Sequence, residues 1–125
     1  MRIHHIGIAC EDIHLEIQKL QEIHDVESTS DIVFDKNQNA NLCLVKIKDG
    51  ISLELISGNQ VKSLIKKKIS YYHICYEVDN IEDEIKRILN TGGILMSEPK
   101  PALLFNNRKV AFLMVSYGII ELLEI

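Results

Sequence analysis

The alternation of apolar and polar residues divides the chain into two stretches with the same order of elements. Residues 3–9 alternate as a strand does, and residues 13–20 place apolar side chains three and four apart, as in an amphipathic helix. The same strand and helix patterns return at residues 73–78 and 81–89. Each stretch therefore predicts the order strand, helix, strand, strand, strand. The further expected strands are residues 31–34, 41–47 and 51–56 in the first stretch and residues 94–96, 109–115 and 118–123 in the second.

Capping and turn residues mark the ends of these elements. Asp12 and Asp79 precede the two helices at positions where a carboxylate can accept a hydrogen bond from a free backbone amide. The pair Gly92-Gly93 ends the second helix. Hairpin turns are expected at Asp49-Gly50 and Tyr117-Gly118, and a short helix is expected around residues 61–68.

The repeat predicts one domain over residues 1–125, with a first module at 1–57, a linker at 58–69 and a second module at 70–125. A module of about 55 residues has a marginal core by itself, so the two modules are expected to pack together.

Two histidines and two glutamates occupy equivalent places in the two stretches. His5 and His73 lie in the first strand of each stretch, 68 positions apart (73 − 5), and Glu54 and Glu121 lie in the last strand of each, 67 positions apart (121 − 54). Any one of these residues alone would usually be structural or solvated. A carboxylate among Leu and Ile residues is costly unless it is paired or coordinating, however, and equivalent positions of paired modules face each other. The four side chains therefore predict a single site for one divalent cation.

The donor set suits several metals. Two imidazoles and two carboxylates fit Zn²⁺, Ni²⁺, Co²⁺, Mn²⁺ or Fe²⁺, and an octahedral ion would keep two positions open for a substrate. Strand alternation places His4 on the face opposite His5, so we expect His4 to be structural.

Composition bounds the class of protein. The chain has 125 residues, of which 46% are hydrophobic, and a formal net charge of −4, which is typical of a soluble domain and argues against a nucleic-acid binder. The cysteines Cys10, Cys43 and Cys75 form no close pair, which indicates a reducing compartment. No apolar run approaches the ~18 residues that cross a membrane. We therefore expect a cytoplasmic protein with neither membrane nor nucleic acid as a partner.

The pattern resembles the vicinal-oxygen-chelate superfamily, which includes glyoxalase I, methylmalonyl-CoA epimerase, extradiol dioxygenases and bleomycin-resistance proteins. The resemblance is closest to methylmalonyl-CoA epimerase. It implies an α+β fold in which two tandem βαβββ modules form a curved eight-stranded sheet around a metal-binding cleft, and it implies a homodimer. Its metal positions fall on His5, Glu54, His73 and Glu121, and Glu54 at the second position is similar to glyoxalase I. The segments that carry the resemblance are residues 5–9, 73–81, 108–113 and 120–124.

The resemblance implies a metal-dependent proton transfer next to a chelated carbonyl, with Glu54 or Glu121 as the catalytic base. The substrate would be an acyl thioester, as for the epimerase, or a hemithioacetal, as for glyoxalase I (lactoylglutathione lyase). The acid that epimerases carry before the third strand has no match in residues 36–40, and Asp35 is the nearest acid. The superfamily also includes non-catalytic binding proteins and Fe²⁺ oxygenases; Glu54 argues against an oxygenase by adding a fourth ligand. The loop expected beside the substrate carries Phe105, Asn107 and Arg108.

Overall fold

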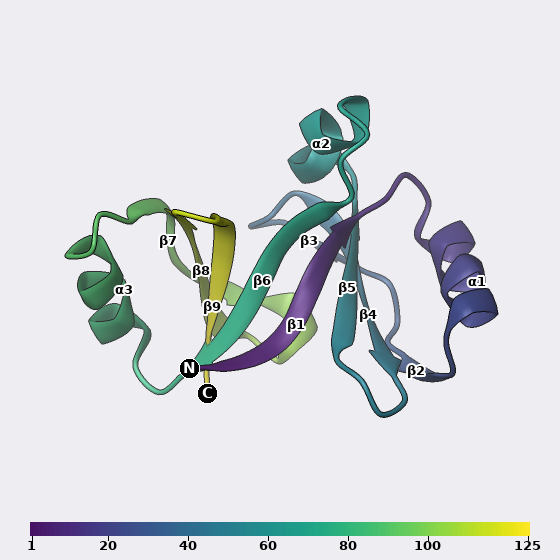
Figure 1. The fold of residues 1–125 in the computed structure, drawn as a ribbon, viewed down its shortest axis with the longest axis horizontal. Helices are drawn as coiled ribbons and strands as arrows, with labels where there is room; N and C mark the ends of the chain where they lie inside the picture. Colours follow the sequence, from purple (N-terminus) through teal and green to yellow (C-terminus); the bar gives the residue numbers. More distant parts are fainter.

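Nine strands form a single curved sheet, and three α-helices accompany it. A computed structural model describes residues 1–125. The predicted α+β class with two similar halves is confirmed (Figure 1). The elements in chain order are β1 (Arg2–Ala9), α1 (Ile13–Ile23), β2 (Val26–Thr29), β3 (Val33–Asp35), β4 (Ala40–Ile47), β5 (Ser52–Ser57), η1 (Asn59–Val61), α2 (Lys62–Lys66), β6 (Tyr71–Val78), α3 (Ile81–Leu89), β7 (Ile94–Ala102), η2 (Leu103–Phe105), β8 (Arg108–Val115) and β9 (Gly118–Glu124).

The strand order places the first strand of each half at the centre of the sheet. The order is β2-β4-β5-β1-β6-β9-β8-β7, and β3 pairs with β4 outside this path. Strands β1 and β6 are antiparallel to each other, while β1 is parallel to β5 and β6 is parallel to β9. The sequence predicted eight strands, and β2 is the one it missed. Three of the four β2 side chains are exposed, so the strand carries almost no apolar alternation.

Local signals at the helix ends were mostly correct. Asp12 caps α1 by accepting a hydrogen bond from the amide of Leu15 at 3.1 Å. Helix α3 is capped by Asn80, which accepts from the amide of Asp83 at 2.9 Å, so the prediction of Asp79 was wrong by one residue. Asparagine and aspartate are equally good caps, and the sequence Asp79-Asn80 did not distinguish them.

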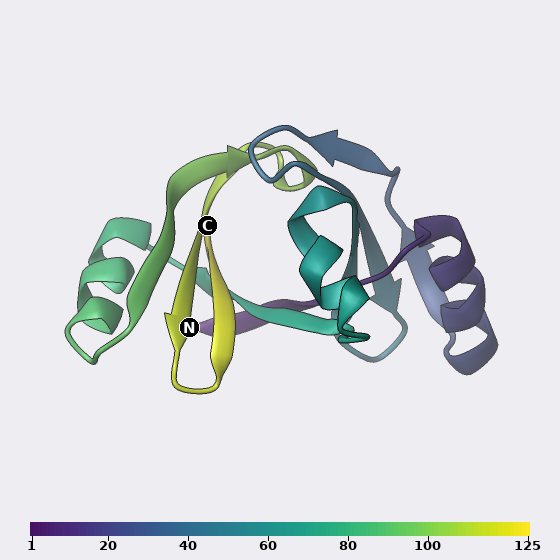
Figure 2. The ribbon, with the colours of Figure 1, turned by 90° about the horizontal axis from the view of Figure 1, so that it is seen from above.

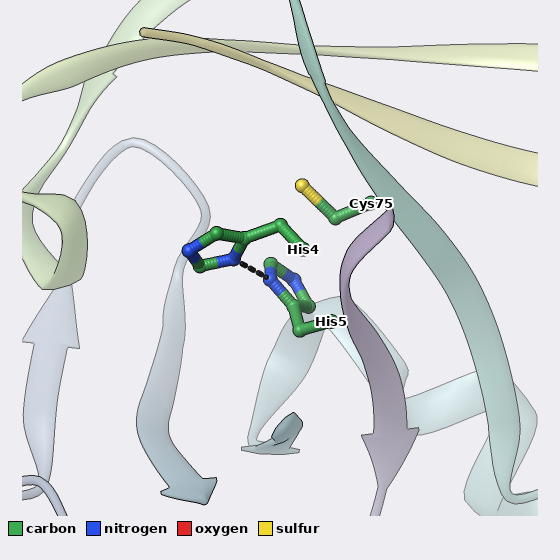
Figure 3. A group of neighbouring side chains, drawn as sticks. All are labelled: His4, His5 and Cys75. Carbon is green, nitrogen blue, oxygen red and sulfur yellow. Dashed lines mark hydrogen bonds between the residues drawn. The ribbon is translucent and has the colours of Figure 1, made fainter. Parts of the chain in front are cut away.

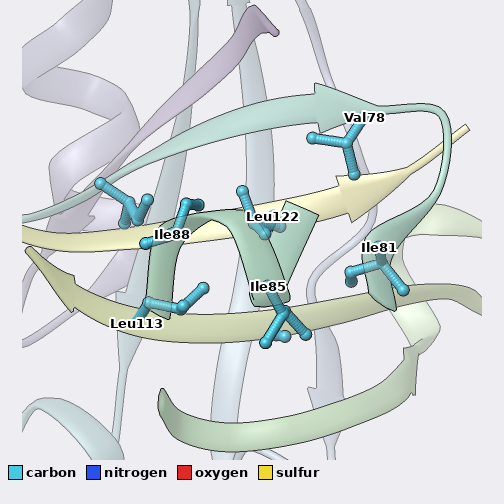
Figure 4. Close-up of a cluster of buried hydrophobic side chains, with 8 residues drawn as sticks. Val78, Ile81, Ile85, Ile88, Leu113 and Leu122 are labelled. Carbon is cyan, nitrogen blue, oxygen red and sulfur yellow. The ribbon is translucent and has the colours of Figure 1, made fainter. Parts of the chain in front are cut away.

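Two apolar cores lie on the outer face of the sheet, each beneath its own helix. Helices α1 and α3 flank the sheet at opposite ends (Figures 1 and 2). Residues Ile81, Ile85 and Ile88 recur at helical spacing, and this face of α3 packs against β6, β8 and β9 (Figure 4). The core beneath α1 includes Leu20 and Leu55 and forms a separate cluster.

The two ends of the sheet approach each other above the inner face. Figure 2 shows β3 beside η2 at the top of the curve. Asp35 accepts a hydrogen bond from the amide of Leu103 at 3.2 Å, and the Asn37 side chain donates to the carbonyl of Pro101 at 3.1 Å. The inner face of the central strands is thereby enclosed. None of the helices has the length and apolar character that a membrane crossing requires.

Candidate metal centre

The register of the central strands brings the four predicted ligands onto the inner face. Gly7 of β1 pairs with Glu54 of β5, and Cys75 of β6 pairs with Glu121 of β9. Across the central pair, His5 lies opposite Cys75 and Gly7 lies opposite His73. Paired residues point to the same face of a sheet, so both histidines and both glutamates face inward.

The four donor atoms form a compact group, and the ligating atoms all lie within 4.8 Å of one another. The Nε2 atoms of His5 and His73 are 3.2 Å apart. Glu121 Oε1 lies 3.1 Å from Nε2 of His5 and 3.2 Å from Nε2 of His73. The corresponding distances from Glu54 Oε1 are longer, 3.5 Å and 3.4 Å.

Burial and unmet hydrogen bonding both fit a cation at this place. His5, Glu54 and Glu121 are fully buried, and His73 is 4% exposed. All four carboxylate oxygens lack a hydrogen-bond partner, although the imidazole nitrogens of both histidines lie 3.1–3.5 Å from the two Oε1 atoms. Donors about 2.0–2.2 Å from one ion lie about 3.3–3.6 Å apart in a tetrahedron and about 2.8–3.1 Å apart along octahedral edges. The observed separations of 3.1–3.5 Å fall within the span of these ranges.

Opposite charges keep the four groups ionised despite burial. Burial lowers the pKa of His5, but Glu54, Cys75 and Glu121 raise it to a value well above 6.5. Burial also opposes the charge on His73, but the close carboxylates of Glu121 and Glu54 raise its pKa above 6.5. Burial raises the pKa of each glutamate, but the two histidines bring both below 4.5. The histidines therefore hold protons that a metal must displace.

Gly7 makes room for the His73 ring. A Cβ atom at position 7 would lie 2.3 Å from Cε1, 2.5 Å from Nδ1 and 2.7 Å from Nε2 of His73. The ring has little freedom to move away, because Tyr72 lies edge-on at 4.7 Å and Phe112 at 5.3 Å between ring centroids. The absence of a side chain at Gly7 thus positions a predicted ligand.

His4 does not point away from His5, so this prediction from strand alternation was wrong. The pairing of β1 with β6 passes from Ile3↔Tyr76 to His5↔Cys75, which leaves His4 at a β-bulge. The bulge turns the His4 ring toward the inner face, where its Nδ1 lies 2.8 Å from Nδ1 of His5 (Figure 3). A bulge depends on the partner strand, so the sequence of β1 alone gave no sign of it.

Asp35, the acid nearest to the position that epimerases use, has a structural environment. It is 2% exposed and accepts hydrogen bonds from the amides of Asn37, Gln38 and Leu103 and from the Gln38 side chain. These bonds hold the β3–β4 turn against η2. Both carboxylate oxygens are therefore engaged away from the four donor atoms.

The predicted substrate-loop residues occupy different environments. Phe105 is buried and stacks on the His5 ring at 5.2 Å. Arg108 donates to Glu77 at 2.9 Å and to the carbonyl of Glu124 at 2.8 Å, and Asn107 is exposed. A cavity of about 90 Å³ opens beside Phe112, whose ring contacts His73. Its lining comprises Asn37, Gln38, Gln60, Ser97, Glu98, Lys100, Pro101, Val110 and Phe112, which the sequence did not indicate as a group.

Comparison with known proteins agrees with this architecture. The family model described as the glyoxalase/bleomycin resistance protein/dioxygenase superfamily matches residues 4–112. The chain belongs to this superfamily. No curated protein matches the sequence.

Solved structures share the superfamily fold over almost the whole chain. Methylmalonyl-CoA epimerase from Mycobacterium tuberculosis has a TM-score of 0.84 at 17% identity and covers 98% of this chain and 87% of its own. A hypothetical protein from Bacillus halodurans has a TM-score of 0.77 at 21% identity, covering 99% of this chain and 94% of its own. A variant of Streptomyces coelicolor methylmalonyl-CoA epimerase, in complex with 2-nitronate-propionyl-CoA, has a TM-score of 0.75 at 22% identity and covers 99% of this chain and 96% of its own.

Proposed function

We propose that the chain is a metal-dependent enzyme that transfers a proton next to a carbonyl, in the manner of methylmalonyl-CoA epimerase. The observation that carries this proposal is the group of His5, Glu54, His73 and Glu121, whose buried carboxylate oxygens have no hydrogen-bond partner. These four residues would hold one divalent ion of Zn, Ni, Co or Mn. The structural likeness to epimerases supports the same function at the level of the fold.

A cation at this place would polarise a bound carbonyl and so acidify the neighbouring C–H bond. The chain must supply the base that takes this proton. Glu54 is the better candidate of the two glutamates, because it is held less closely by the histidines. Its Oε1 lies 3.4–3.5 Å from the imidazole nitrogens, whereas Oε1 of Glu121 lies 3.1–3.2 Å from them. Glu121 would then stay in place as a ligand. Glu54 would hold the proton on a carboxylate oxygen before returning it.

The neighbouring cavity favours a small, polar acyl group. Its volume of about 90 Å³ equals roughly three water molecules of about 30 Å³ each, so a thiol carrier would stay outside. Its lining provides the ammonium group of Lys100, which suits a carbonyl or carboxylate oxygen, together with the carboxylate of Glu98 and three side-chain amides. The side-chain N–H groups of Asn37 and Gln38 already donate to Pro101 and Asp35. A methylmalonyl thioester has this chemistry. Methylmalonyl-CoA is bound by an epimerase of the same fold, which has a TM-score of 0.74 at 22% identity.

Isomerisation of a hemithioacetal, as in glyoxalase I, is the second candidate. Two observations favour it. A carboxylate, Glu54, occupies the second ligand position, and Asp35 is engaged by backbone amides, so that no further acid adjoins the four donors. Both candidate reactions use the same base and the same carbonyl chemistry.

Deuterium exchange tests the proposal and separates the candidates. The metal-free protein is loaded with Zn²⁺, Ni²⁺, Co²⁺ or Mn²⁺ and given methylmalonyl-CoA in D₂O, and label at the acidic carbon is measured by mass spectrometry. Exchange that Glu54→Gln abolishes supports the epimerase-like reaction. Formation of a thioester from methylglyoxal and glutathione would support the glyoxalase-like one. Metal binding without either reaction would indicate a binding protein and overturn the proposed catalysis.

We also propose that the chain forms a homodimer through the outer face of the central strands. Cavities of about 330 and 480 Å³ lie on this face, and both are lined by Ile6 and Tyr71. Tyr71 is 78% exposed and Tyr117 is 64% exposed, and together with Ile6, Ile74 and Ile119 they line one surface, as in the contiguous apolar patches that mark interfaces. Analytical ultracentrifugation should give a dimer that Tyr71→Glu weakens, with Glu27→Lys on β2 as the surface control. A monomeric wild type at micromolar concentration would contradict this.

A further inference from the structure

His4 and His5 share a hydrogen bond that permits only one direction if His5 binds a cation. An imidazole that coordinates through Nε2 carries its proton on Nδ1. The Nδ1 atom of His5 lies 2.8 Å from Nδ1 of His4, so His4 must accept this proton and keep its own on Nε2. We propose that His4 is a positioning residue that fixes the tautomer and the ring orientation of His5. This inference rests on the metal centre of the proposed function.

The surroundings of His4 hold it in the accepting position. The β-bulge in β1 places both histidine rings on the inner side of the strand (Figure 3). Phe105 stacks on the His5 ring at 5.2 Å with an interplanar angle of 19°, and it meets the His4 ring edge-on at 5.3 Å. His4 is half-buried and His5 is fully buried, so water competes weakly for His5 Nδ1. The backbone bulge and the Phe105 ring therefore both contribute to the position of the two histidine rings.

The second half of the chain supplies a natural comparison. Pairing of β6 with β1 skips Tyr72, between His73↔Gly7 and Tyr71↔Ile8, so Tyr72 lies at a second bulge equivalent to that of His4. The Tyr72 ring lies edge-on to His73 at 4.7 Å, but Nδ1 of His73 has no hydrogen-bond partner. The two bulges thus place a ring beside each histidine, and only His4 adds a hydrogen bond.

The cluster of His4, His5 and Cys75 is also a candidate for a second cation, since its ligating atoms lie within 4.8 Å of one another. Cys75 is fully buried, and burial together with the charge of Glu121 raises the pKa of its thiol to about 12. A protonated thiol is a poor ligand, whereas a hydrogen bond of 2.8 Å between the two rings needs no ion. The distances therefore favour a positioning role.

Three variants separate the hydrogen bond from ring packing. His4→Phe keeps a ring and removes the acceptor, His4→Asn restores an acceptor oxygen near the place of Nδ1, and Tyr72→Phe makes a matched change at the other bulge. Zn²⁺ affinity is measured by competition with a chromophoric chelator. We expect His4→Phe to bind about 10–100-fold more weakly, because loss of a partner of a metal-ligating histidine has this effect. His4→Asn should recover most of the loss, and Tyr72→Phe should match the wild type.

A second measurement does not require the metal. In ¹H–¹⁵N spectra, His5 should show a slowly exchanging Nδ1–H proton in the wild type and in His4→Asn, with and without Zn²⁺, but not in His4→Phe. An unchanged proton signal and unchanged affinity in His4→Phe would overturn the inference, as would two Zn²⁺ ions in the wild type and one in His4→Phe. If the wild type binds no Zn²⁺, the proposed metal centre fails, and the spectra of the metal-free protein still decide the role of His4.

Discussion

Substitution of Gly7 by alanine should remove metal binding without touching a ligand. The added Cβ would lie 2.3 Å from Cε1 and 2.7 Å from Nε2 of His73. Ordinary contact begins at 3.4 Å, so these atoms must move by 1.1 Å (3.4 − 2.3) and 0.7 Å (3.4 − 2.7). Gly7 does not need a left-handed backbone, since its φ is not among the positive values. The effect therefore comes from the collision alone.

The displacement exceeds what a metal site tolerates. Donor distances in such sites vary by about ±0.2 Å, so a shift of 0.7 Å at Nε2 removes His73 as an effective donor. We expect Gly7→Ala to bind Zn²⁺ at least about 100-fold more weakly, near the level of His73→Ala. Overpacking should also lower the free energy of unfolding of the metal-free protein by about 1–3 kcal/mol.

Calorimetric titration with Zn²⁺, together with thermal unfolding, measures both effects. Gly50→Ala is the matched control, because a Cβ there meets no atom closer than 3.4 Å and lies in a hairpin turn. It should leave affinity and stability close to those of the wild type. Zn²⁺ affinity of Gly7→Ala within about threefold of the wild type would show that His73 is not a ligand or that its ring is free to move. Either result would refute the assigned geometry.

Three further predictions concern charge, catalysis and the core. Zn²⁺ affinity should rise with pH above 6.5, because the neighbouring glutamates raise the pKa values of His5 and His73 and the ion must displace their protons. Calorimetric titrations in buffers of different ionisation heat should show this proton release. The metal-free protein should lose stability over the same rise in pH, as folded-state protonation of these histidines is lost; a pH-independent midpoint of urea unfolding would contradict this. Asp35→Asn should lower the free energy of unfolding by about 1–3 kcal/mol, because the new side-chain amide places a second donor opposite the Leu103 amide. The variant should keep deuterium exchange into the substrate. Loss of exchange in a folded variant would make Asp35 the base. Ile85→Ala should cost about 2–5 kcal/mol in chemical unfolding with unchanged Zn²⁺ affinity, and a lower affinity would mean that the α3 core reaches the centre.

The repeat made most of the fold predictable. Equivalent offsets of the histidines and glutamates placed the first and last strands of both halves, and apolar periodicity placed both helices. The same reasoning could not give features that depend on pairing between strands. His4 was assigned to the wrong face because a bulge opposite β6 interrupts strict alternation. Strand β2 was missed because its side chains are mostly exposed and polar.

The sequence also gave no sign of site features that depend on the missing side chain of a glycine or on contacts between distant loops. Gly7 looks like any strand glycine until the His73 ring is seen to occupy the place of its Cβ. Asp35 appeared as a stray acid near the end of a strand, and its engagement by Leu103 crosses the whole curve of the sheet. The cavity lining combines residues from four separate segments, none of which carries a motif by itself.

The separation of the two outer cores has a consequence for how the chain unfolds. The apolar cluster beneath α1 and that beneath α3 share no residue, and the central pair of β1 and β6 joins them. On the inner face, Leu44 and Leu104 each pack against apolar residues of the other half, and Asp35 bonds to Leu103, so the halves are also joined there. A cation held by donors from β1, β5, β6 and β9 would bind only when both halves are folded, and at 100 times its dissociation constant it would add about 2.7 kcal/mol to that state alone. Occupancy of the centre would therefore sharpen an unfolding transition that the inner-face contacts already couple, and removal of the ion by a chelator should broaden it.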